Sequence, residues 1–300
     1  MKLKANRMLL LAVLLLAASF GAHAYSCTVS SPGFVSVYDA LAATANLNQS
    51  AFTLNCTRAS GEASTLNYQA NTDDGLYNNG ANNRAKLPTA ANTFIKYDFF
   101  TTSGLSTNWS KGNKCIFGQI NFGASLSASQ TKTYYSSIPA AQTGLAQGAY
   151  FDTVTINVAY LGAQTSCQNN ATISASGTFP VQISNVPGCQ LLPLPPPSVD
   201  FTYTAFQNTA AIAAPSAFSA RCSTNLPYTM TLDSSIGVVS GLNYSLSITN
   251  RLSTAVVTGG SGNGAQQDFY IRGSMPGGQA GTCATATCNA SDSRVLTISY

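Results

Sequence analysis

Apolar and polar residues alternate with a period of two along much of the chain. In NTFIKYDFF (92–100), Ile95, Tyr97 and Phe99 alternate with polar residues, and DTVTINVAY (152–160) follows the same pattern. This period is typical of β-strands that bury one face, and clusters of Gly, Asn and Ser between the runs indicate turns. We therefore predict strands near residues 51–57, 65–70, 93–101, 115–122, 131–137 and 150–160.

The later part of the chain repeats the plan of the earlier part. The segment 136–160, SSIPAAQTGLAQGAYFDTVTINVAY, has a counterpart in 272–300, RGSMPGGQAGTCATATCNASDSRVLTISY, and each closes with an alternating run that ends in Tyr. Many short strands without helical patterns predict an all-β fold of two immunoglobulin-like antiparallel β-sandwich domains in tandem. The predicted division is a signal peptide at 1–24, a first domain at 25–165, a linker at 166–186 and a second domain at 187–300.

The N-terminus has the three parts of a secretory signal peptide. Basic Lys2, Lys4 and Arg7 precede the apolar run MLLLAVLLLAASF (8–20), and AHA follows at 22–24. The apolar run is short for a membrane span, so we predict export with cleavage after the AHA motif.

The composition argues against several classes of function. Three of the 14 Lys and Arg residues lie in the predicted signal, so the remaining 11 nearly balance the 10 Asp and Glu residues, and no basic patch predicts a nucleic-acid partner. The single histidine, His23, also lies in the signal, which removes the commonest general base. Adjacent Asp73 and Asp74 lack the order of a calcium loop. We therefore predict no enzyme, no metal site and no cofactor.

All eight cysteines follow the predicted signal, and an even number in an exported chain favours disulfides. Zinc is the weaker alternative because there is no CxxC pair. Cys56 and Cys222 each end a strand-like run, so Cys27–Cys56 and Cys189–Cys222 fit bridges between the first two strands of each sandwich. The remaining cysteines would pair as Cys115–Cys167 and Cys283–Cys288.

Together these features resemble the spore coat protein U-like (SCPU) domain family. The first copy matches through Cys27, Cys56, Arg84, FIKYDFF, Trp109, SSIPAAQ with Gln142, and GAYFDTVTINVAY. The second copy matches through Cys189, Cys222, GLNYSLSI, RGSMPGGQ and the final strand, but it lacks the Trp and the Asp-Thr that precede that strand. The family includes pilins and tip adhesins of archaic chaperone–usher pili in Gram-negative bacteria.

The resemblance implies an immunoglobulin-like domain that lacks its final strand. The open groove would lie along the last strand of the second domain, with Leu296, Ile298 and Tyr300 as acceptor residues. A periplasmic pilus chaperone would fill this groove first. The N-terminal donor strand of the next pilin subunit would then replace it at the outer-membrane usher, by β-augmentation. The implied location is the cell surface, at a fimbrium tip reached through the periplasm, with a role in attachment or biofilm formation.

The linker contains another alternating run, GTFPVQISNV (177–186), in which Phe179, Val181 and Ile183 are the apolar members. This run can complete the first domain as an internal donor strand or open the second domain, and the sequence leaves both alternatives open. The Pro-rich LLPLPPP (191–197) fits an edge segment inside the second domain. A stiff polyproline spacer is the alternative.

The remaining expectations concern binding and position. The first copy is longer than the second, and the surplus places Tyr77, Leu105 and Trp109 on loops rich in Gly, Asn and Ser. We expect these residues to contact an unknown surface or receptor, unless Trp109 is a core residue. Cleavage after residue 24 would leave two residues ahead of Cys27, too few for a donor strand, which favours the pilus tip. The alternatives are a pilus-shaft subunit and an outer-layer structural protein without a pilus.

Overall fold

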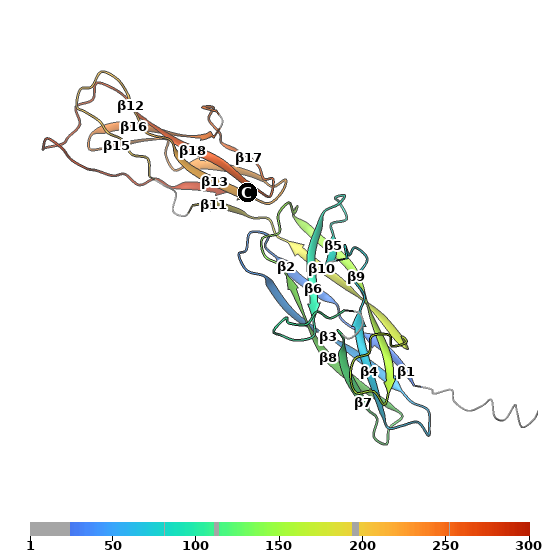
Figure 1. Ribbon diagram of the computed structural model, residues 1–300. Coiled ribbons are helices and arrows are strands. Elements are labelled where there is room, and N and C mark those ends of the chain that lie inside the picture. The colour runs from blue at the N-terminus through green and yellow to red at the C-terminus, as the bar shows by residue number, and fades with distance from the viewer. Residues whose placement is uncertain (1–24, 81, 111–113, 194–197, 252) are drawn as a thin grey trace, which may run out of the picture.

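The computed structural model of the protein shows two elongated β-rich bodies arranged end to end (Figure 1). The structure describes residues 25–80, 82–110, 114–193, 198–251 and 253–300, so the predicted signal peptide and part of the Pro-rich run lie outside the described residues. Within these ranges every regular element is a strand, and no helix is long and apolar enough to cross a membrane. The prediction of an all-β chain is confirmed. We call residues 25–185 the N-terminal body and residues 189–300 the C-terminal body.

The N-terminal body contains the first ten strands. They are β1 (Ser26–Ser30), β2 (Phe34–Tyr38), β3 (Asn46–Thr57), β4 (Thr65–Thr72), β5 (Asn83–Lys86), β6 (Phe94–Phe100), β7 (Ile116–Asn121), β8 (Ser127–Ile138), β9 (Gly148–Gly162) and β10 (Ala175–Asn185). One layer has the order β1-β3-β8-β6-β5, and the other contains β7, β4, β9, β10 and β2. The layers join at one edge, where Lys86 of β5 pairs with Phe151 of β9.

The core of the N-terminal body lies between these two layers. Period-two alternation sends Ile95, Tyr97 and Phe99 of β6 inward, where each is at most 2% exposed, while Lys96 on the opposite face is exposed. Because most of the strands alternate in this way, the two inner faces meet in one continuous apolar core.

The C-terminal body contains the other nine described strands. They are β11 (Cys189–Leu192), β12 (Ala211–Ile212), β13 (Ser216–Cys222), β14 (Pro227–Leu232), β15 (Ile236–Val239), β16 (Leu242–Asn250), β17 (Gly259–Ser261), β18 (Gln266–Met275) and β19 (Leu296–Ser299). One sheet has the order β11-β13-β18-β16-β15, with β12 also paired to β18. The other sheet has the order β17-β14-β19.

The two bodies repeat the same contacts at corresponding places. The backbone N–H of Gln142 donates to the Tyr38 hydroxyl, and the backbone N–H of Gln279 donates to the Tyr203 hydroxyl, at 3.2 and 2.9 Å. Each glutamine also follows a Ser-apolar-Pro motif that the sequence repeats. The internal repeat is therefore visible in three dimensions as well as in the sequence.

Backbone contacts hold the two bodies together where they meet. The N–H of Thr224 donates to the carbonyl of Leu145 at 3.2 Å. Gly264 has a positive φ of 75° and lies so close to Gly144 that a Cβ would overlap the Gly144 backbone nitrogen. The close approach of the two bodies therefore requires glycine at position 264.

Candidate functional site

Strand β10 lies inside the N-terminal body, between β9 and β2. It pairs antiparallel with β9 along its whole length and parallel with β2 from Val181 onward. Phe179, Val181 and Ile183 point into the core and are at most 1% exposed. The alternating run of the linker is therefore the strand that completes the N-terminal body.

The packing of β10 explains its individual residues. The ring centroid of Phe179 lies 5.6 Å from that of Phe99 and 5.8 Å from that of Tyr134, so this side chain reaches the opposite layer. Gly177 passes so close to the carbonyl of Val29 that any Cβ would overlap it. A side chain at 177 would push β10 away from β1, which is why the strand has glycine there.

Strand β9, one neighbour of β10, has a counterpart in the C-terminal body. The N–H of Asp73 donates to the carbonyl of Thr155, and the N–H of Thr155 donates to Oδ1 of Asp73, both at 2.9 Å. Asp233 and Val295 form the same two bonds, at 3.0 and 3.1 Å. Strand β19 therefore corresponds to β9, with Val295 at the position of Thr155.

Residues 199–203 correspond to β2, the other neighbour of β10. Tyr203 receives the bond from Gln279 that Tyr38 of β2 receives from its own glutamine. Val199 and Phe201 alternate with exposed residues and lie against Gly273, where a Cβ would overlap both side chains. Unlike β2, this segment forms no strand.

Among the described residues, no strand lies between β19 and residues 199–203, where β10 lies in the N-terminal body. Strand β19 pairs with β14 on one side alone, so its other edge presents unpaired backbone groups. Leu296 and Ile298 are half-buried at the margin of the core, while Tyr300 is 61% exposed. We call the free side of β19, together with Val199 and Phe201, the acceptor edge.

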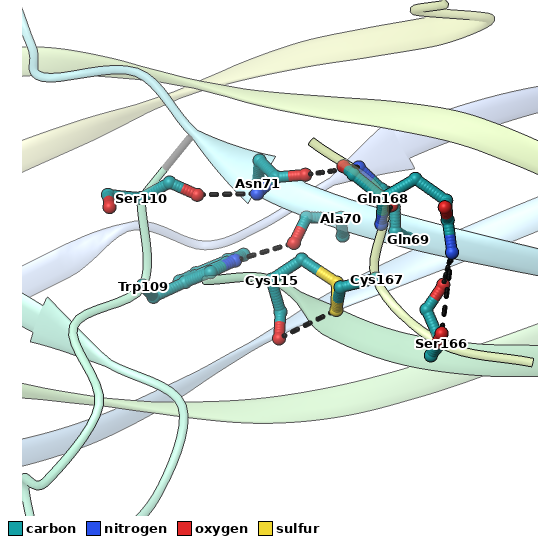
Figure 2. Close-up of a disulfide and its surroundings, with 9 residues drawn as sticks. All are labelled: Gln69, Ala70, Asn71, Trp109, Ser110, Cys115, Ser166, Cys167 and Gln168. Carbon is teal, nitrogen blue, oxygen red and sulfur yellow. Dashed lines mark hydrogen bonds between the residues drawn. A yellow bond between two sulfur atoms is a disulfide. The ribbon is translucent and has the colours of Figure 1, made fainter. Parts of the chain in front are cut away.

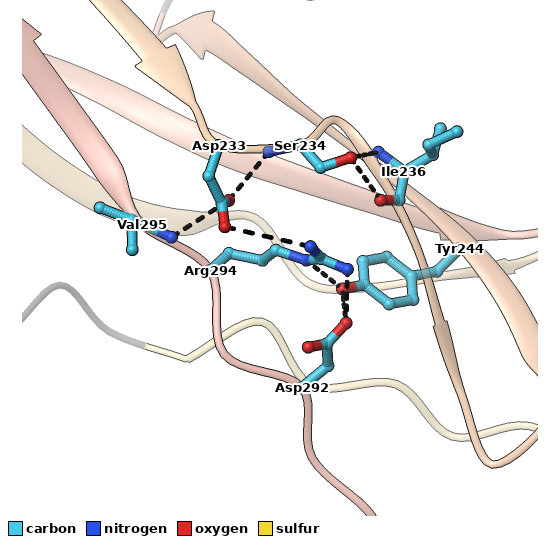
Figure 3. Close-up of polar contacts among 7 residues, drawn as sticks. All are labelled: Asp233, Ser234, Ile236, Tyr244, Asp292, Arg294 and Val295. Atoms are coloured by element: carbon cyan, nitrogen blue, oxygen red, sulfur yellow. Dashed lines mark hydrogen bonds and ion pairs between the residues drawn. The ribbon is translucent and has the colours of Figure 1, made fainter.

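A polar cluster lies at the start of β19 (Figure 3). The Tyr244 hydroxyl donates to Oδ2 of Asp292 at 2.5 Å, and Nε of Arg294 donates to the same hydroxyl at 2.7 Å. Nη2 of Arg294 lies 2.5 Å from Oδ2 of Asp292, and Nη1 lies 4.0 Å from Oδ2 of Asp233. The cluster ties the start of β19 to β14 and to the opposite sheet.

The completed body has a related but different pair. The Tyr97 hydroxyl donates to Oδ2 of Asp152 at 2.7 Å, and burial raises the pKa of the Asp152 carboxyl above its ordinary range. At Asp292 the hydrogen bond from Tyr244, with the charge of Arg294, lowers the pKa of the carboxyl. At the same position in the fold, burial thus raises the pKa of the carboxyl in one body, while a hydrogen bond and a positive charge lower it in the other.

All eight cysteines form disulfides. Cys27–Cys56 joins β1 to β3, and Cys189–Cys222 joins β11 to β13 at the corresponding place. Cys115–Cys167 and Cys283–Cys288 are the other two bonds, each within one body.

Trp109 is a core residue, which confirms the core alternative for this residue and excludes the surface-contact alternative. It is 2% exposed, its ring stacks on Phe52 at 5.3 Å between centroids, and its Nε1 donates to the carbonyl of Ala70 at 2.7 Å. Figure 2 shows it beside the Cys115–Cys167 disulfide. Trp109 is buried although the residues around it in the sequence are polar, because burial of a large aromatic side chain is favourable.

Tyr77 and Leu105 lie on separate loops and are both half-buried. The Tyr77 ring is tilted against Phe94 at 6.1 Å, with Nζ of Lys86 at 5.6 Å from its centroid. Leu105 adopts a positive φ of 52° in a turn. Among the described residues, no group of three or more acidic, Cys or His side chains could hold a metal.

Comparisons with solved structures give similar arrangements at low sequence identity. A chain of the CsuC–CsuE chaperone–tip adhesion subunit complex of Acinetobacter baumannii is 12% identical, with a TM-score of 0.45, over 92% of this chain and 100% of that one. The CupB6 tip adhesin of Pseudomonas aeruginosa is 11% identical, with a TM-score of 0.36, over 93% and 96%. CfaE, the adhesive subunit of CFA/I fimbria of enterotoxigenic Escherichia coli, is 10% identical, with a TM-score of 0.27, over 90% and 98%.

A search of curated proteins finds no match. The family comparison matches residues 12–157, which include β1–β8 and most of β9, to the Spore Coat Protein U domain. Residues 12–157 of the chain are therefore similar to the Spore Coat Protein U domain.

Proposed function

We propose that the chain is a subunit of a chaperone–usher pilus whose C-terminal body accepts a strand from another polypeptide chain. The observation that carries the proposal is the contrast between the two bodies. In the N-terminal body β10 pairs with β9 and β2, while in the C-terminal body both flanking segments are present and β19 has a free edge in the described residues. With its match to the Spore Coat Protein U domain, the chain is proposed as a structural protein rather than an enzyme.

The physical basis of the proposal is β-augmentation. An added strand forms main-chain hydrogen bonds with β19, and alternate apolar side chains cover the partly buried core residues. Strand β10 shows within this chain what such a strand looks like, because Phe179, Val181 and Ile183 are buried at every second position. The added strand would run antiparallel to β19 and would cover Leu296 and Ile298.

The partners follow from the proposal and from the family resemblance. A periplasmic chaperone would cover the acceptor edge during export, because a free apolar edge promotes aggregation. At an outer-membrane usher, the donor strand of the next pilin subunit would replace the chaperone. The pilus would then place the chain on the cell surface.

We further propose that the chain sits at the pilus tip and acts as an adhesin. Residues from Tyr25 onward are engaged within their own body: the Tyr25 ring packs on Phe122 and Tyr160 at 6.0 and 6.3 Å, and β1 pairs with β3. Strand β10 is likewise used internally. The described strands therefore supply an acceptor but no spare donor, which suits the end of a fibre, and the proposed contact loops are those of Tyr77 and Leu105.

The test adds a strand to the chain itself. The exported chain would be extended at its C-terminus by a flexible linker and a copy of residues 175–185, with a matched control in which Asn replaces the three buried apolar residues of the copy. We expect the extended chain to be a soluble monomer without a chaperone, and the control to need one. Equal recovery of both chains would contradict the acceptor proposal. Labelling the chain on intact pili then tests position, since label along the shaft would contradict a tip role.

A further inference from the structure

Beside the acceptor edge, the C-terminal body differs from the N-terminal body in two side chains. Since Val295 holds the position of Thr155, the preceding residue, Arg294, holds the position of Val154. The second change is at Gly237, which pairs with Tyr244 across β15 and β16. In the N-terminal body the residue that pairs with the corresponding Tyr97 is Asn83.

The two differences depend on each other sterically. A Cβ at position 237 would overlap both the guanidinium of Arg294 and the hydroxyl of Tyr244. The guanidinium therefore occupies room that the Asn83 side chain fills in the N-terminal body, where it reaches the Tyr97 hydroxyl. Arg294 keeps the contact with the tyrosine and adds an ion pair with Asp292.

Solvent still reaches this ion pair in the C-terminal body. The side chains of Arg294 and Asp292 are 23% and 29% exposed. At the corresponding positions Val154 and Asp152 are 0% and 4% exposed, and they lie opposite Phe179 and Val181 of β10. A strand added to β19 in the same register would cover the ion pair with apolar side chains.

Covering the ion pair carries a cost that covering Val154 does not. Removing two charges from water is unfavourable, and a buried ion pair is commonly less stable than apolar groups of similar volume. In the open form, by contrast, the partly hydrated pair holds the start of β19 to Tyr244 and to Asp233. The pair therefore favours the open form of the edge relative to the filled form.

We infer that Arg294 is a positioning residue that braces the acceptor edge in its open form and weakens retention of the strand that fills it, so that one bound strand can be exchanged for another. This inference rests on the proposed function, because it assumes that a strand from another chain adds to β19. The partner is an extended segment with apolar residues opposite Arg294 and Asp292. In the N-terminal body, where the strand belongs to the same chain, valine takes the place of the arginine.

The experiment uses the full exported chain extended by the linker and the copy of residues 175–185. Amide hydrogen exchange, read on peptides that include the linker, measures how often the added strand opens. The variants are Arg294→Val, Arg294→Met, which keeps the aliphatic stem, and the double variant Gly237→Asn with Arg294→Val, which restores the side chains of the N-terminal body. The matched control is Arg251→Val, because Arg251 forms an exposed ion pair of 3.0 Å with Asp268 on another part of the C-terminal body.

We expect opening of the added strand to fall about tenfold or more in the double variant, in line with the usual gain from replacing a buried ion pair by apolar groups. Arg251→Val should leave the opening unchanged. Unchanged or more frequent opening in the Arg294 variants would overturn the inference. So would loss of exchange protection throughout the C-terminal body in all three variants, since Arg294 would then act on folding alone. An added strand that exchanges as fast as the linker in the parent chain would instead overturn the proposed function.

Discussion

The Tyr97 hydroxyl donates a hydrogen bond of 2.7 Å to Asp152, and both side chains are enclosed in the core of the N-terminal body. Oδ1 of Asp152 also accepts the backbone N–H of Leu76 at 2.9 Å, so this carboxylate anchors the loop that follows β4. Asp152→Ala would leave these donors without a partner in a buried place. We expect a loss of about 3 kcal/mol in the free energy of unfolding, measured by urea denaturation. Asp152→Asn, which keeps an acceptor, should cost less, and an equal cost would contradict this account.

The stability of the two bodies should change in opposite directions as pH falls. Burial raises the pKa of Asp152 and Asp98 in the N-terminal body, so the stability linked to these groups is present below the ordinary value of 3.8 and is lost as pH rises through the raised values. Hydrogen bonds from Ser219 and Tyr244 lower the pKa of Asp268 and Asp292 respectively in the C-terminal body. Their stability is present above 3.8 and is lost as pH falls through the lowered values.

Between about pH 5 and pH 3 the C-terminal body should therefore lose stability relative to the N-terminal body. The single tryptophan reports the N-terminal body, and far-ultraviolet circular dichroism reports the whole chain, so the two transitions can be followed separately. If tryptophan fluorescence showed the N-terminal body unfolding at a higher pH than the rest of the chain, the expected order of the two bodies would be contradicted.

Strand β10 should be essential to the folding of the N-terminal body. A chain truncated after Tyr160 loses a strand that buries Phe179, Val181 and Ile183, so we expect it to be insoluble. A chain truncated after Val186 should be soluble and folded. Periplasmic expression of the two chains, followed by size-exclusion chromatography, makes the comparison, and equal solubility would refute the role of β10.

Trp109 and Tyr77 should separate core stability from surface binding. Trp109→Ala removes the stacking on Phe52 and the hydrogen bond to Ala70, and should cost about 3–5 kcal/mol of stability. Tyr77→Ser should change the melting temperature little and reduce adhesion, as should Leu105→Ser. Adhesion that persists in both loop variants would remove these loops from the proposed contact surface.

The disulfides should differ in their contributions to stability. Cys115–Cys167 spans 52 positions, so replacing both residues with Ser should cost about 4 kcal/mol by loop-closure entropy. Cys283–Cys288 spans 5 positions, and its loss should cost about 2 kcal/mol. Urea denaturation of the two double variants gives the comparison, and a larger effect for the shorter loop would contradict the entropic account.

The strong alternating runs predicted the long strands well. The run at 93–101 is β6 and the run at 150–160 is β9, because each has several consecutive pairs of inward apolar and outward polar residues. The short β2 and β5 escaped notice: in β2 the outward Val35 and Val37 are as apolar as the inward residues, which removes the alternation. Such edge segments are defined by their pairing with other strands rather than by their own pattern.

The candidate site was predicted in part. Alternation marked Leu296 and Ile298 as a strand and Phe179 as part of another, but long-range pairing alone decides that β10 belongs to the N-terminal body. The polar cluster at the start of β19 was missed, because Asp292 is followed by Ser-Arg rather than by Thr. The signal that could have found it is spacing, since Asp292 precedes Tyr300 by as many positions as Asp152 precedes Tyr160.

Strand β10 runs into β11 with a connection at residues 186–188, so it is also the covalent tether between the two bodies. Figure 1 shows it directed along the N-terminal body toward the junction. A pulling force on the C-terminal body would act along the axis of β10, which is hydrogen-bonded to antiparallel β9 on one side and to parallel β2 on the other. Its hydrogen bonds would carry that load in shear and together, rather than opening one after another from an end. The strand that completes the fold would thus be the mechanical anchor through which tension reaches the N-terminal body.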